Sequence, residues 1–116
     1  MAVKVPTIER TGAYDGVPTV VWREVASGDT LQPFLVQGQY GFAGSVQISG
    51  TFGGTTVSLL QSNDATSWFS AYDPVGNLIQ TTSSAIYEIS LAAAYLKPEF
   101  SGGSGYSIDI ILVLRG

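Results

Sequence analysis

Residues 45–62 read SVQISGTFGGTTVSLLQS and carry the clearest structural pattern in the chain. In the first half, Val46 and Ile48 alternate with polar residues, which is the period of a β-strand with one buried face. Residues 53 and 54 are both glycine, and a glycine pair between two such runs predicts a two-residue hairpin. Residues 55–62 are therefore expected to form the return strand.

Similar short runs fill the chain from residue 17 onward. Strands are expected at residues 20–25, 31–40, 45–52, 55–62, 67–72, 78–80, 85–89, 96–100 and 106–114. Turns are expected at 26–29 and 73–77, and a hairpin loop at 101–105, because these stretches are rich in Gly, Asp and Ser. Strands at intervals of roughly 8–12 residues are typical of sandwiches and barrels. The sequence predicts an all-β protein with a single small antiparallel β-sandwich or jelly-roll-like domain over residues 17–116.

Residues 1–16 have a different pattern. Val3, Val5 and Ile8 alternate weakly, Pro6 interrupts them, and residues 13–16 read as a turn. We predict an extended N-terminal arm that docks on a partner or on the edge of its own domain. Such arms join subunits by adding a strand to a neighbouring sheet.

The composition excludes several kinds of chemistry. The 116 residues include no His and no Cys, which rules out imidazole catalysis, thiolate nucleophiles, disulfides and metal sites built on these residues. Because no nucleophile and base are paired in the sequence, we expect neither an enzyme nor a cofactor. Five basic and nine acidic residues give a net charge of −4, which disfavours nucleic acid as a partner.

Hydrophobic segments argue against a membrane location. The first ten residues contain no apolar run typical of a secretory signal. The most apolar segment, residues 108–114, is far shorter than the about 20 residues that a membrane helix needs. We expect a soluble protein that is made in a cytoplasm.

Four local patterns contain residue types that occur in functional sites. Asn63, Asp64 and Asp73 resemble cation ligands but fit turn formation better, because no calcium-loop spacing is present. Glu88 and Asp109 fit the solvated face of a strand better than a catalytic carboxylate pair, and residues 102–105 fit a loop better than an anion cradle. The aromatic residues are a possible sugar-stacking platform or simply core: Trp22, Trp68, Tyr72, Tyr87, Tyr95 and Tyr106.

Residues 53–68 run from a glycine-rich turn through a strand to a Ser-Asn-Asp turn and a Trp. This stretch resembles a recurrent pattern in small virion proteins of tailed bacteriophages. Residues 85–89, 95–98 and 101–103 resemble the closing half of the same proteins, so that the likeness covers roughly residues 45–114. Ala65 stands where those proteins often have Gly, and Leu96-Lys97-Pro98 stands where an Arg-Pro pair is common.

The resemblance implies a capsid cement or decoration protein. Such proteins sit as homotrimers on the outer surface of the capsid, bind the major capsid protein and stiffen the shell. The residues expected to bind the partner are Val3, Lys4, Val5, Pro6 and Ile8 in the arm, with Trp22 and Arg23 as anchors. A carbohydrate-binding or adhesion module, and a tail or head-completion subunit, remain open as alternatives.

Overall fold

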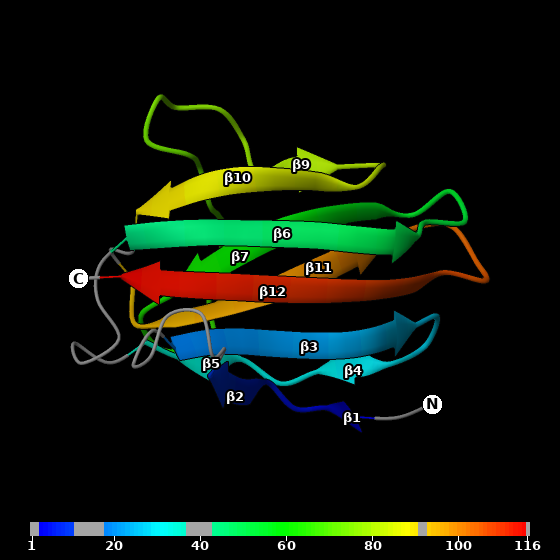
Figure 1. The fold of residues 1–116 in the computed structure, drawn as a ribbon, viewed down its shortest axis with the longest axis horizontal. Helices are drawn as coiled ribbons and strands as arrows, with labels where there is room; N and C mark the ends of the chain where they lie inside the picture. The colour runs from blue at the N-terminus through cyan, green and yellow to red at the C-terminus, as the bar shows by residue number, and fades with distance from the viewer. Residues whose placement is uncertain (1–2, 11–17, 37–42, 91–92, 116) are drawn as a thin grey trace.

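All regular elements in the described part of the chain are β-strands, as the sequence predicts. The computed structural model describes residues 3–10, 18–36, 43–90 and 93–115 (Figure 1). Its strands are β1 (Val3–Lys4), β2 (Thr7–Arg10), β3 (Pro18–Ala26), β4 (Thr30–Leu31), β5 (Phe34–Leu35), β6 (Ala43–Thr51), β7 (Thr56–Ser62), β8 (Phe69–Ser70), β9 (Gln80–Thr81), β10 (Ala85–Ser90), β11 (Tyr95–Ser101) and β12 (Ser107–Arg115).

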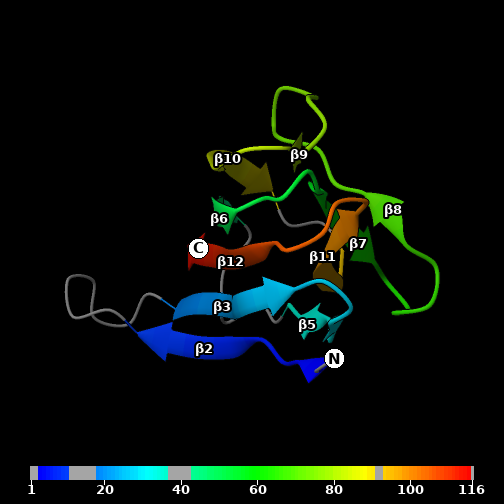
Figure 2. The same cartoon turned by 90° about the vertical axis from the view of Figure 1, so that its right-hand side faces the viewer.

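Two antiparallel sheets form a sandwich. The sheet named here the β6 sheet has the order β10-β6-β12-β3-β2, and the β7 sheet has the order β5-β11-β7-β8, with β9 also paired to β7. Figure 2 shows the two sheets as facing layers. Successive strands change sheet, from β5 to β6 to β7 and again from β10 to β11 to β12. This alternation is the topology of a jelly roll, so the predicted fold class is confirmed.

The core lies between the two sheets and is built from alternate residues. In β6, Val46 and Ile48 are buried whereas Gln47 is exposed. The nine-residue strand β12 supplies four buried side chains, those of Ile108, Ile110, Leu112 and Leu114. Burying each side chain of this size contributes about 1.5–3 kcal/mol. The period-two pattern of the sequence therefore indicates which face of a strand is buried between the sheets.

The turn at Gly53-Gly54 is present, but the hairpin predicted there is wrong. β6 and β7 belong to different sheets, so this turn carries the chain across the sandwich. The hairpin loop predicted at residues 101–105 is wrong for the same reason, because this loop also crosses the sandwich, from β11 to β12. The two crossings touch, because the Ser104 N–H donates to the Gly53 carbonyl at 3.1 Å. An alternating apolar pattern does not require two strands to pair side by side. The strands can also lie in opposite sheets and bury their apolar faces against each other.

Three predicted strands are shorter than expected. Where one strand is predicted over residues 31–40, the described residues up to 36 contain the end of β4 and then β5. Pro33, which has no N–H to donate, lies between these two short strands. Of residues 67–72, only Phe69–Ser70 form a regular strand, because the Ser67 N–H donates to the Asp64 side chain. At 78–80 the strand begins at Gln80, after the fully buried Ile79.

Candidate docking surface

The described part of the arm, residues 3–10, lies on the edge of the domain itself, which is one of its two expected positions. β1 pairs in parallel with β4, and β2 forms the outermost strand of the β6 sheet beside β3. Figure 1 shows both short strands along one side of the sandwich. Residues 1–2 and 11–16 of the arm lie outside the described residues.

The apolar side chains of this segment face solvent. Val3 is 65% exposed and Val5 is 58% exposed, whereas the intervening Lys4 and the following Pro6 are half-buried. Ile8 is opposite the core residue Val20 in the register but is still 42% exposed. Val3, Val5 and Ile8, named here the apolar stripe, are therefore three exposed apolar side chains along one edge of the domain.

Backbone hydrogen bonds fix the position of this stripe. The Gln32 N–H donates to the Lys4 carbonyl at 2.9 Å, which extends the pairing between β1 and β4. The indole Nε1–H of Trp22 in turn donates to the Gln32 carbonyl at 3.0 Å. A residue of the core is thus linked to the arm through the backbone of Gln32.

The prediction that Trp22 anchors a partner is wrong. Its side chain is completely buried between the sheets, with its indole N–H bonded internally. Burial of so large a side chain stabilises the core. A buried indole N–H needs a hydrogen-bond partner, which here is the Gln32 carbonyl. Trp22 acts on the docking surface only indirectly, by positioning the segment that pairs with the arm.

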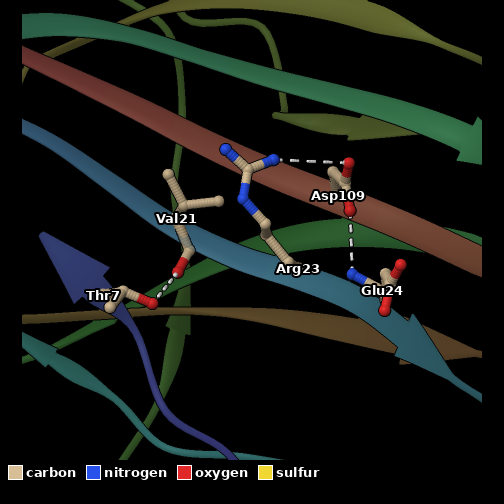
Figure 3. Close-up of polar contacts among 5 residues, drawn as sticks. All are labelled: Thr7, Val21, Arg23, Glu24 and Asp109. Atoms are coloured by element: carbon tan, nitrogen blue, oxygen red, sulfur yellow. Dashed lines mark hydrogen bonds and ion pairs between the residues drawn. The ribbon is translucent and has the colours of Figure 1, made fainter. Parts of the chain in front are cut away.

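The free edge of β2 completes the surface. Thr7 is opposite Val21 in the register, and its Oγ1 donates to the Val21 carbonyl at 3.5 Å (Figure 3). Among the strands described, β2 pairs only with β3. Its outer edge therefore carries backbone N–H and C=O groups that can pair with an extended segment of another chain.

Arg23 belongs to a different feature of the same sheet. Figure 3 shows its guanidinium turned toward Asp109 on β12 and away from Thr7 on β2. Arg23 Nη1 lies 3.7 Å from Asp109 Oδ2, and both side chains are partly exposed. The structure therefore brings Val3, Lys4, Val5, Pro6 and Ile8 together on one edge but does not group Arg23 with them. An exposed ion pair of this kind contributes little stability.

The six aromatic residues that the sequence offers as a possible sugar platform do not form one. Trp22 is buried, Lys97 Nζ lies 4.5 Å from the ring centroid of the half-buried Trp68, and Tyr106 stacks on Phe100 at 5.2 Å. Of the six, Tyr72 alone is classed as exposed, at 54%. The most exposed aromatic among the described residues is Phe69, at 66%, which the sequence pattern did not single out.

The aspartates at the loops act as turn formers, as interpreted from the sequence. Asp64 Oδ1 accepts the N–H groups of Thr66 and Ser67, each at 2.9 Å. Asp73 Oδ1 accepts those of Val75 and Asn77 in the same way. Glu88 is exposed on β10. Within the described ranges no group of three or more acidic residues could hold a metal ion, and no helix there is long and apolar enough to cross a membrane.

Comparison with known proteins adds little. No family model and no curated protein matches the chain. Among solved structures, the chain resembles a hydroquinone 1,2-dioxygenase, PnpCD, crystallised with Cd²⁺ and 4-hydroxybenzonitrile. The sequence identity is 15% and the TM-score 0.35, over 97% of this chain and 64% of that one. The chain thus spans less than two thirds of that protein, and a likeness at this level carries no functional argument.

Proposed function

We propose that this chain is a structural virion protein that binds the outer surface of a tailed-phage capsid as a cement or decoration subunit. The observation that supports this most directly is the apolar stripe of Val3, Val5 and Ile8, which is fixed by backbone hydrogen bonds and yet exposed. Apolar side chains held on an ordered edge are typical of protein–protein contact sites. The likeness of residues 45–114 to small phage virion proteins supports the same role.

The partner is the major capsid protein. An extended segment of that protein adds to the free edge of β2 by main-chain hydrogen bonds, and the apolar stripe is buried in the same contact. Each contact is small, because the stripe has three side chains. A homotrimer presents three such edges at once, so that multivalency converts weak contacts into firm attachment across capsomer boundaries. The net charge of −4 fits the outer surface better than the DNA-facing one.

Cosedimentation with capsids that lack this chain tests the proposal. Wild-type protein is expected to pellet with such capsids at a fixed ratio to the major capsid protein and to have the mass of a trimer by light scattering. The double variant Val3→Asp/Val5→Asp is expected to bind at least tenfold more weakly, because two charges must then be desolvated.

A single variant on another loop tests whether an added surface charge by itself weakens binding. Val75→Asp changes a side chain that is 82% exposed on the turn after Asp73, away from the arm. This variant is expected to bind as the wild type does. Equal binding by all three proteins, or no saturable binding by the wild type, contradicts the proposal. Assembly of the free chain into rings or fibres would instead favour a tail or head-completion role.

A further inference from the structure

A second surface feature lies at the β8 edge of the β7 sheet. A hollow of about 420 Å³ opens where β7 ends, beside β8. It is lined by Gln61, Ser62, Asn63, Asp64, Ser67 and Phe69, together with the start of the segment that leads into β11. Figure 2 shows β8 and β9 on the side of the sandwich away from β2 and β5. The hollow is therefore separate from the arm and from its proposed contacts.

Phe69 gives the hollow an exposed aromatic face. It is opposite Gln61 in the register, so the two side chains lie on the same face of the β7 sheet. Its exposure of 66% is high for a phenylalanine. A single exposed aromatic is common on protein surfaces, but here it adjoins a concave wall of polar side chains.

Three planar polar side chains of that wall each make hydrogen bonds through only one of their two polar atoms. Gln61 Nε2 donates to the Ser70 carbonyl at 3.3 Å, and Asn63 Oδ1 accepts the Ala94 N–H at 3.1 Å. The Asp64 side chain accepts its three hydrogen bonds, from Ser62, Thr66 and Ser67, through Oδ1. Within the described residues these contacts leave Gln61 Oε1, Asn63 Nδ2 and Asp64 Oδ2 without a hydrogen bond. The side chains are thus oriented in advance, with one polar atom of each still available to a ligand.

We infer that this hollow binds a neutral saccharide. The apolar face of a sugar ring stacks on Phe69, and neighbouring hydroxyl groups bond with the free atoms of Gln61, Asn63 and Asp64. A pocket with one aromatic surface and a few fixed polar groups suits a ligand that has both an apolar face and a hydroxyl rim. The carboxylate and the two carboxamides supply both acceptors and donors, which a hydroxyl group needs.

The charge of Asp64 favours a neutral ligand over an anionic one. Hydrogen bonds from the Ser67 and Thr66 N–H groups and the Ser62 hydroxyl lower the pKa of Asp64, so that its carboxyl group is ionised at neutral pH. A negative group in the wall repels phosphate and carboxylate. Nucleotides and acidic sugars are therefore disfavoured, although their rings could also stack on Phe69.

Amide chemical shifts measured during sugar titrations test the inference. The full ¹⁵N-labelled chain is titrated separately with glucose, galactose, mannose and N-acetylglucosamine, and with inorganic phosphate. At least one sugar is expected to cause saturable shifts at residues 61–69, with millimolar affinity. Phe69→Ala is expected to weaken this binding about tenfold, because the ring on which the sugar stacks is lost. Asp64→Asn is expected to weaken it as well, because the charged acceptor is lost.

Tyr72→Ala is the matched control, because Tyr72 is an exposed aromatic that does not line the hollow. This variant is expected to bind the sugar as the wild type does. The inference is overturned if none of the four sugars gives saturable shifts, if Phe69→Ala binds like the wild type, or if phosphate binds in preference. None of these outcomes bears on capsid attachment, which the arm variants test separately.

Discussion

Asp109 on β12 accepts a hydrogen bond from the backbone N–H of Glu24 on β3, with 2.8 Å between Oδ1 and N. This bond stabilises a β-bulge. Ile108 pairs with Val25 and Ile110 with Trp22, so β3 has one more residue than β12 over this interval. Because of the extra residue, Trp22 and Val25 both face the core although they are three positions apart. The left-handed conformation of Glu24, with φ of 51°, belongs to the same bulge.

Removing this acceptor should destabilise the sandwich. Asp109→Ala leaves the Glu24 N–H without its partner, and we expect the free energy of unfolding to fall by about 1 kcal/mol. Asp109→Asn retains an oxygen in the same place and should lose less than half as much. Urea unfolding measures both. An equal loss in the two variants would mean that the negative charge beside Arg23, and not the hydrogen bond, is the stabilising feature.

Trp22→Phe should loosen the arm as well as the core. The substitution removes the indole N–H that bonds to Gln32 and leaves a partly filled cavity, so we expect a loss of about 1–3 kcal/mol. Hydrogen exchange should in addition speed up selectively at the Gln32 amide, which donates to Lys4. Phe34→Leu, also in the core, serves as the control. It should lower overall stability without this local effect; the same exchange pattern in both variants would disprove the link from Trp22 to the arm.

Because the loop at residues 101–105 lies against the Gly53-Gly54 turn, we predict that two glycines of this loop differ in how well they tolerate substitution by alanine. Gly103 and Gly105 both have positive φ values, of 70° and 67°. A Cβ at Gly103 would lie 2.3 Å from the Thr55 backbone nitrogen, whereas one at Gly105 would meet nothing within 4 Å. We expect Gly105→Ala to cost about 1–2 kcal/mol from backbone strain alone. Gly103→Ala should cost clearly more, since backbone must also move. Thermal unfolding compares them, and similar losses would contradict the close approach.

Acid should destabilise the wild type through Asp64. The Ser67 and Thr66 N–H groups lower the pKa of this carboxyl group in the folded protein, whereas the unfolded chain retains the ordinary value of 3.8. The unfolded state then binds more protons at low pH, so the stabilisation is complete above the ordinary pKa and disappears as the pH falls through the lowered one. Melting temperatures of the wild type and Asp64→Asn, followed from pH 7 to acid, should converge in that window. Parallel curves would show that Asp64 does not titrate as expected.

Local residue patterns are enough to predict the all-β class and the inward-facing residues of several strands. The alternation of Val46 and Ile48 with polar neighbours identifies the buried face of β6, and the apolar run of β12 marks a strand with four buried side chains. Turn residues such as Asp73 act through bonds to backbone groups two and four positions away. These features are readable because strand periodicity and turn chemistry are local.

Which strands pair and which aromatic side chains are exposed depend instead on contacts between distant parts of the chain. The Gly53-Gly54 turn fits a hairpin and a crossing equally well, and contact with Ser104, about fifty residues away, is part of the crossing. Trp22 faces the core beside the bulge that Asp109 on β12 stabilises. Phe69 is exposed because β8 is the edge strand of the β7 sheet and borders the hollow. Such long-range contacts depend on how the whole chain closes around its core, and a local residue pattern does not contain that information.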